Sequence, residues 1–158
     1  MEIPKELYLD TNMIHSWFRN FMTSLKKNEP LKMPDTLQFI VNQKELKLFT
    51  TTLTKIEIFR YLKAEWNRDE KSCNEIWETF VNSFDITVIN VKEIELEELL
   101  ALVAKVATKK KTLVNLMHLQ VAKKNNLLFL TGEEKLKEKY KEYYDKVLTY
   151  EDLRKLFA

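Results

Sequence analysis

Short apolar runs alternate with longer amphipathic stretches along this 158-residue chain, and the alternation limits the fold more than any other feature. Four runs have the length and polar boundaries of buried strands, and a shorter fifth follows them. The runs cover residues 3–9, 46–51, 85–91, 126–131 and 146–150. Parallel strands need a crossover connection, which is usually a helix. The pattern therefore predicts an α/β fold, with a mostly parallel sheet of four to five strands flanked by helices.

Helical periodicity fills the segments between the runs. Two segments repeat apolar residues at intervals of three and four: Ile56, Phe59, Leu62 and Trp66, and then Leu99, Leu100, Val103 and Val106. A threonine with an acid three residues later marks three helix starts, at residues 54–57, 131–134 and 149–152. Residues 26–35, with the sequence "KKNEPLKMPD", are predicted to form a loop.

The composition is that of one folded domain covering residues 1–158. With 45% hydrophobic and 11% aromatic residues, the chain has enough apolar surface for a core. One glycine and three prolines disfavour the many tight hairpins of an all-β fold. A net charge of +2 neither demands nor excludes a nucleic-acid partner. The lone Cys73 suits a reducing compartment, so we expect a soluble, cytoplasmic protein with no membrane partner.

Acidic side chains follow the predicted strands at one edge of the sheet. Asp10 ends the first run, Glu57 lies at a helix start after the second, and Glu133 follows the fourth. Asn115 lies in the first turn of the helix before that fourth run, with Thr112 as its expected cap. Ligands collect at the carboxyl ends of parallel strands, so we expect these side chains to share one cleft. Carboxylate oxygens suit Mg²⁺ or Mn²⁺, and the pattern predicts a metal site.

Each acid also has a structural explanation. Asp10 could be the N-cap of the helix that follows it. Glu57 could close a capping box, and Glu133 or Glu134 could interact with the dipole of a helix start. The order and spacing of all these positions favour a shared site over separate caps.

Four short motifs, taken in order, resemble the PIN-domain family of metal-dependent ribonucleases, whose best-known members are the VapC-type toxins. "YLDTNMI" at 8–14 is similar to the opening strand, acid and helix start of that family. "TTLTKIEIFRYL" at 51–62 is similar to the helix that carries its glutamate. Residues 113–136 are similar to the third and fourth motifs together, in which an acid opens a helix and the next strand ends in Thr-x-Asp. The chain departs from the family at two positions, with Asn115 for the third acid and Glu133 for the fourth aspartate.

The resemblance implies a three-layer PIN-like fold and a metal-dependent single-strand endoribonuclease, a hydrolase of phosphodiester bonds that uses Mg or Mn. The matching positions are Asp10, Glu57, Asn115 and Glu133 as catalytic residues, the three acids among them as metal ligands, and Asn12 and Thr131 as supporting residues. The implied partners are RNA, a second copy in a homodimer and, for a toxin of a toxin–antitoxin pair, a small antitoxin protein.

Asn115 keeps an oxygen ligand but lacks the charge of an acid, which leaves other functions open. One alternative is a catalytically inactive PIN-like module that binds RNA or a protein. Another is a flap or DNA nuclease, because related folds gather acids at the same sheet edge.

Lysines and histidines lie near the acids in the sequence. Lys109, Lys110 and Lys111 precede Asn115 and are predicted to bind RNA phosphates, with a solvated basic face as the alternative. Both histidines lie among apolar neighbours, and the resemblance implies hydrolysis by metal-activated water. We therefore expect neither of them to act directly in catalysis.

Overall fold

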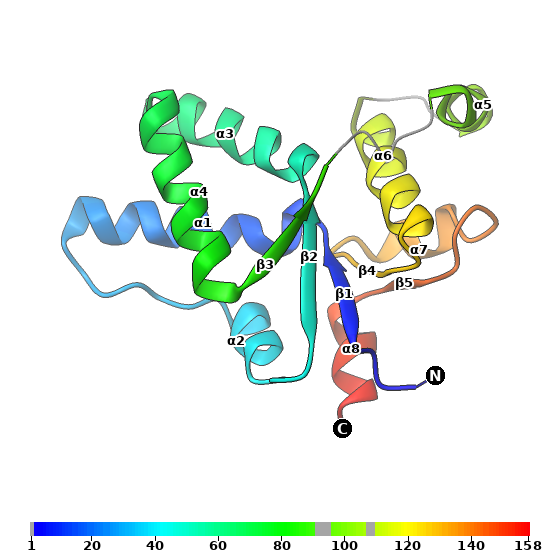
Figure 1. Cartoon of the computed structure of the whole chain (residues 1–158), viewed down its shortest axis with the longest axis horizontal. Coiled ribbons are helices and arrows are strands. Elements are labelled where there is room, and N and C mark those ends of the chain that lie inside the picture. Colours follow the sequence, from blue (N-terminus) through cyan, green and yellow to red (C-terminus); the bar gives the residue numbers. More distant parts are fainter. Residues whose placement is uncertain (1, 91–95, 107–109) are drawn as a thin grey trace.

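The protein is a single parallel sheet between two groups of helices, as Figure 1 shows for the computed structural model. Its backbone is described for residues 2–90, 96–106 and 110–158, and its side chains for the same residues except positions 106 and 110. The described strands are β1 (Glu6–Leu9), β2 (Lys47–Thr51), β3 (Ile86–Ile89), β4 (Leu128–Leu130) and β5 (Val147–Leu148). They are all parallel, in the order β3-β2-β1-β4-β5, which confirms the predicted sheet.

Helices connect the strands and cover both faces of the sheet. They are α1 (Thr11–Lys27), α2 (Asp35–Val41), α3 (Thr52–Trp66), α4 (Glu70–Phe84), α5 (Leu96–Val106), α6 (Lys110–Lys124), α7 (Glu134–Lys139) and α8 (Tyr150–Leu156). In the described parts of the chain, no helix combines the length and apolar character needed to cross a bilayer. The predicted loop is confirmed in its main part, because α1 and α2 leave residues 28–34 between them.

The central strand β1 supplies side chains to two separate cores. Successive residues of a strand point to opposite faces of a sheet. Leu7 and Leu9 therefore join the core beneath α1, α2, α3, α4 and α8, whereas Tyr8 joins the core beneath α5, α6 and α7. The neighbouring strand β4 divides in the same way, with Leu130 in the first core and Phe129 in the second. This alternation fixes the register of β1 in the sheet and, with it, the position of the carboxyl end of the strand.

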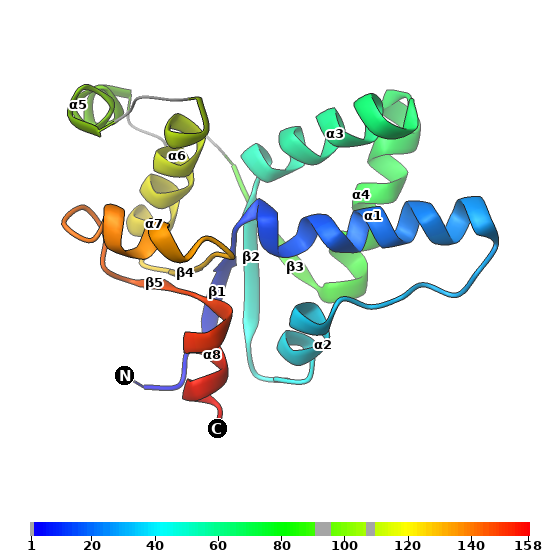
Figure 2. The ribbon, with the colours of Figure 1, turned by 180° about the vertical axis from the view of Figure 1, so that it is seen from behind.

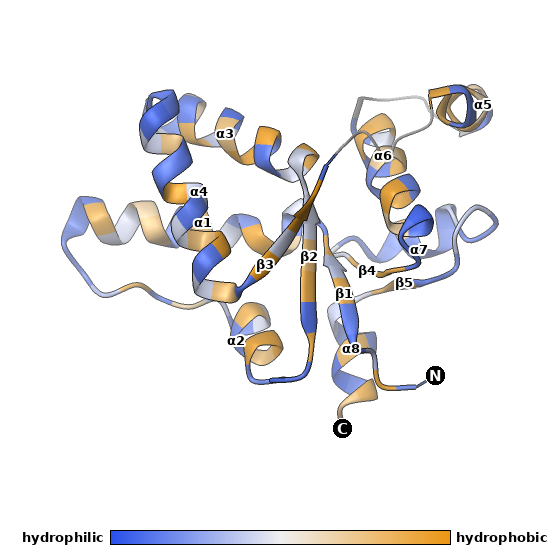
Figure 3. Ribbon diagram, in the orientation of Figure 1, coloured by the Kyte–Doolittle hydropathy of each residue, from blue (hydrophilic) through white to orange (hydrophobic). Residues whose placement is uncertain are grey.

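Aromatic rings pack α1 against α4 in the first core. The ring of Trp17 lies 5.0 Å from that of Phe80, and the rings of Phe18 and Trp77 are stacked at 5.9 Å. Both helices are hydrophobic on one side and hydrophilic on the other, which Figure 3 shows as mixed colours along each ribbon. The packing fixes α1 and α4 on the same side of the sheet, and Figure 2 shows the whole length of α1 there.

Asparagine and aspartate end the helices of this glycine-poor chain. Asn28, Asn67 and Asp85 are the C-caps of α1, α3 and α4, and each has a left-handed backbone with φ near 50°. Glycine usually takes this conformation, and asparagine is the common substitute. Short polar side chains thus replace glycine as the signal that ends these three helices.

The predicted apolar face of α3 is right for Phe59, Leu62 and Trp66, which lie in or against the first core, and wrong for Ile56. Ile56 is 62% exposed, whereas Ile58 is fully buried and packs with Leu62 in the first core. The α5 pattern is also only partly right, because Leu99 is buried and Leu100 is exposed. The fourth residue of that pattern, at position 106, lies outside the described side chains.

The predicted start of α8 is confirmed, whereas the starts of α3 and α6 differ from the prediction. Thr149 forms the expected capping box with Asp152 at the start of α8. Helix α3 begins earlier than predicted, because Thr51 is its N-cap and accepts a hydrogen bond from the Thr54 amide. Glu57 therefore does not close a capping box from Thr54. Thr112 is not a cap either, since α6 is already helical at Lys110.

Replacing Ile58 with alanine should lower the free energy of unfolding by about 2–5 kcal/mol, because it leaves a cavity in a packed core. Ile56→Ala is the matched control on the same helix, and its effect should stay within about 0.5 kcal/mol. Urea denaturation followed by circular dichroism measures both. Equal losses from the two variants would contradict the observed orientation of α3.

Candidate active site

A pocket of about 470 Å³ lies at the carboxyl edge of the sheet, where α1 and α3 begin. Figure 2 shows these two helix starts beside the ends of β1 and β2, with α6 across from them. The lining residues are Asp10, Thr11, Asn12, His15, Ser16, Arg19, Glu57, Lys111, Val114, Asn115 and Glu133. The structure therefore brings together all four predicted site residues from four separate segments.

Asp10 connects β1 to α1 and forms the floor of the pocket. It is the N-cap of α1, as one explanation of its position required, and Oδ1 accepts a hydrogen bond from the Thr11 amide at 2.8 Å. Oδ2 accepts a hydrogen bond from the Thr131 hydroxyl at 2.9 Å. The side chain is only 4% exposed, and burial raises the pKa of Asp10. A buried carboxylate held this way is oriented by the fold and incompletely solvated.

Glu57 reaches the same pocket from α3. Its Oε1 accepts a hydrogen bond from the Thr11 hydroxyl at 2.8 Å and lies 2.8 Å from His118 Nε2. Burial raises the pKa of Glu57, but the hydrogen bond and charge of His118 and the bond from Thr11 outweigh it, so the pKa is lowered. Thr11 thus joins the two carboxylates, since its amide binds Asp10 and its hydroxyl binds Glu57.

His118 has a role that the sequence did not predict. It is 1% exposed and lies between Tyr8 and Glu57, with Nδ1 2.5 Å from the Tyr8 hydroxyl. The same hydroxyl lies 3.1 Å from Thr51 Oγ1. A tyrosine that donates to Nδ1 leaves the ring proton on Nε2, which then donates to Glu57. The spacing of three residues from Asn115 to His118 is the sequence signal for this placement, because it puts both on one face of α6.

Glu133 and Asn115 form the opposite side of the pocket. Glu133 is the N-cap residue of α7, but its side chain makes no capping bond. Its Oε1 pairs with Lys111 Nζ at 2.8 Å, and its Oε2 lies 3.5 Å from Asn115 Nδ2. The hydrogen bond and charge of Glu133 raise the pKa of Lys111. Glu134 does not line the pocket, so Glu133 is the acid of this loop that faces it.

The two predicted supporting residues tie the β4–α7 loop to α1. Asn12 Oδ1 accepts a hydrogen bond from the Gly132 amide at 2.9 Å, and Asn12 Nδ2 lies 3.3 Å from Thr131 Oγ1. The Thr131 hydroxyl oxygen also accepts from the Glu133 amide at 3.1 Å while it donates to Asp10. These bonds hold Asp10 and the Glu133 backbone at a fixed separation.

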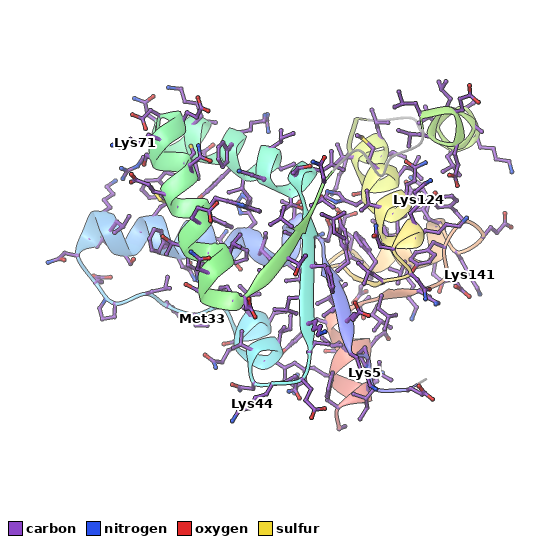
Figure 4. The ribbon with its side chains drawn as sticks, viewed as in Figure 1. Lys5, Met33, Lys44, Lys71, Lys124 and Lys141 are labelled. Carbon is purple, nitrogen blue, oxygen red and sulfur yellow. The ribbon has the colours of Figure 1, made fainter. Side chains whose placement is uncertain are left out.

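Only part of the predicted basic run can be placed. Lys109 and the side chain of Lys110 lie outside the described residues, whereas Lys111 lies in the pocket. Arg19, which the sequence did not indicate, also lines the pocket, two turns after Asn12 on the same face of α1. Other lysines labelled in Figure 4 lie apart from one another around the outside of the molecule. Among the described lysines and arginines, Lys111 and Arg19 are therefore the ones that line the pocket.

His15 shares the wall with Arg19 and packs its ring 4.2 Å from that of Tyr61. Burial lowers the pKa of His15, and the charge of Arg19 lowers it further. A neutral imidazole beside an arginine can accept or donate hydrogen bonds without adding charge.

Oxygen donors dominate the pocket, which suits a hard divalent cation. Asp10 and Glu57 are the carboxylates joined through Thr11. Across residues 2–90, 96–105 and 111–158, however, no three His, Cys, Asp or Glu side chains are grouped closely enough to hold an ion among them. The donor set therefore fits an ion that takes one or two carboxylates and completes its shell with water and substrate oxygens, as Mg²⁺ commonly does.

Removing the buried charge of Asp10 should stabilise the protein in chelator. Because burial raises the folded-state pKa of Asp10, the folded form binds this proton more tightly than the unfolded form, and the ionised carboxylate destabilises the fold at neutral pH. Asp10→Asn should raise Tm by roughly 2–4 °C, the effect of 1 kcal/mol in a domain of this size.

The rise in Tm from Asp10→Asn should be complete above the folded-state pKa of Asp10. It should vanish as the pH falls below the unfolded-state pKa of this residue. Thermal unfolding at several pH values measures it, with Asp35→Asn on the exposed start of α2 as the control. A gain that does not depend on pH would show that the buried charge is not its cause.

Comparison with known proteins adds information about the fold. No model of a known protein family matches the chain, and no curated protein matches it. Among solved structures, it is similar to a chain of the crystal structure of VapBC2 from Rickettsia felis bound to a DNA fragment from their promoter. The TM-score is 0.55 at 12% sequence identity, over 91% of this chain and 96% of that one. The chain therefore has a PIN-like fold.

Proposed function

We propose that the protein is a metal-dependent endoribonuclease that cleaves single-stranded RNA in this pocket. The observation that carries the proposal is that Asp10, Glu57, Asn115 and Glu133 come from four segments and line one pocket. Packing does not explain this arrangement, because burying the carboxylate of Asp10 near a second carboxylate, that of Glu57, costs free energy. The PIN-like fold and the motif resemblance support the same activity.

Each side of the pocket has a part in the proposed reaction. Asp10 and Glu57 would hold Mg²⁺ or Mn²⁺, with Thr11 and His118 fixing the direction of both carboxylates. A bound divalent ion would supply positive charge at the scissile phosphate and activate a water as the nucleophile. Lys111 and Arg19 would bind the phosphates on either side of the scissile bond, which makes RNA binding dependent on salt.

The partners follow from the same proposal. One similar structure is that of VapBC2, and VapC-type toxins are the family members that the motifs resemble. We infer that a small antitoxin would cover this pocket if the protein is the toxin of a pair, and that a homodimer would extend the RNA-binding surface.

Glu57→Gln tests the proposed activity. It keeps the shape of the side chain but removes the charge that faces the pocket, so Mn²⁺-dependent cleavage of a mixed single-stranded RNA should fall by more than the roughly 10- to 100-fold cost of losing a supporting residue. Glu65→Gln is the matched control, because Glu65 is exposed on the same helix and should leave cleavage unchanged. Cleavage by wild-type protein that persists in chelator would contradict a metal-dependent reaction.

A non-catalytic binding module is the second candidate. Two observations favour it: position 115 carries an amide instead of an acid, and Glu133 is paired with Lys111. Both reduce the negative charge that the pocket could offer to a metal ion. Such a module would bind RNA or a protein in the same pocket without cleaving it.

Asn115→Asp separates the two candidates. The added carboxylate should tighten Mn²⁺ binding and raise RNA cleavage about tenfold, and Asp10→Asn in the same chain should abolish the gain. In chelator the variant should have a lower Tm, because like charges in the pocket repel. Isothermal titration, gel-based cleavage and thermal unfolding measure these effects. A variant with neither tighter metal binding nor more cleavage would favour the binding module.

A further inference from the structure

The acids of the pocket have two different electrostatic environments. Asp10 and Glu57 accept hydrogen bonds from neutral groups of Thr11 and Thr131 and from the ring of His118. In the part of the chain that the structure describes, neither of them pairs with a lysine or arginine. Apart from His118 beside Glu57, no described basic side chain is paired with these two carboxylates, so both can still attract a cation that enters the pocket.

Glu133 is already balanced by helix α6. Lys111 and Asn115 are four residues apart, so they lie on the same face of this helix. The ammonium of Lys111 takes one carboxylate oxygen of Glu133 at 2.8 Å, and the amide of Asn115 faces the other at 3.5 Å. Both oxygens of this carboxylate thus face N–H donors from one helix.

The pairing between Lys111 and Glu133 does little for the stability of the fold. The side chain of Lys111 is 72% exposed, and exposed ion pairs contribute little to the free energy of unfolding. Lys111 lines the same pocket as Asp10 and Glu57, so its ammonium lies in the field of all the acids there. A permanent positive charge at this point repels any further cation that approaches Glu133.

We propose that the pocket takes a single divalent cation, beside Asp10 and Glu57, and that the ammonium of Lys111 occupies the place next to Glu133 where a second ion would otherwise bind. The inference rests on the proposed metal-dependent function and specifies its metal content. Asn115 belongs to the same arrangement, because an amide next to Lys111 adds no charge that could hold a second ion. The two remaining N–H donors of the ammonium can bind oxygens of an RNA phosphate.

The experiment counts Mn²⁺ ions bound to the full chain, after removal of metal by chelator, using equilibrium dialysis and electron paramagnetic resonance. Wild type and Asn115→Asp should each bind about one ion, because both keep Lys111. The double variant Lys111→Met with Asn115→Asp should bind about two, with the spectral broadening of ions roughly 4 Å apart. Asn115→Asp with Lys135→Met is the matched control; it removes an exposed lysine outside the pocket and should stay at about one.

The possible failures separate the inference from the proposed function. A wild-type protein that binds no Mn²⁺ would overturn the metal-dependent function, and this inference with it. Two ions in wild type or in Asn115→Asp would overturn the inference alone, and so would a folded double variant that still binds one ion. Circular dichroism confirms folding, and Lys111→Gln with Asn115→Asp is the second variant, for which two ions are again expected.

Discussion

The buried carboxylate of Asp10 is the constraint on which the rest of the site depends. It ends the central strand of the sheet, begins α1 and accepts a hydrogen bond from the β4–α7 loop, so three segments meet at one side chain. A charge buried in this position costs stability. Hydrogen bonds from Thr11 and Thr131 orient this carboxylate toward the pocket.

The sheet was predictable because each strand is a short apolar run between polar boundaries, and the acids were predictable because they follow those runs. β1 shows the limit of this reasoning. Alternation puts Tyr8 on the opposite face of the strand from Leu7 and Leu9, but only the packing shows which helices cover each face. The exposed Ile56 has the same cause, because an apolar residue at a helical interval does not reveal which side of α3 meets the sheet.

The less predictable part of the site comes from residues whose roles depend on contacts distant in sequence. The sequence indicates a core position for His118, and the residue is buried, but its ring also contacts a glutamate 61 positions away in the chain. Lys111 reads as one of several basic residues, and only its distance to Glu133 distinguishes it from the lysines on the outside of the molecule. Composition and spacing can place a side chain on a helix face, but they do not choose its partner.

Tyr8 joins the second core to the pocket, and this gives an unusual limit on sequence variation. In most cores phenylalanine can replace tyrosine, because the two rings fill nearly the same volume. At this strand position the hydroxyl is the partner of His118 Nδ1, so phenylalanine would fill the space and leave a buried ring nitrogen without its hydrogen bond. Homologous proteins that keep the Glu57–His118 contact should therefore keep tyrosine here, while those that vary the histidine should be free to vary both positions together.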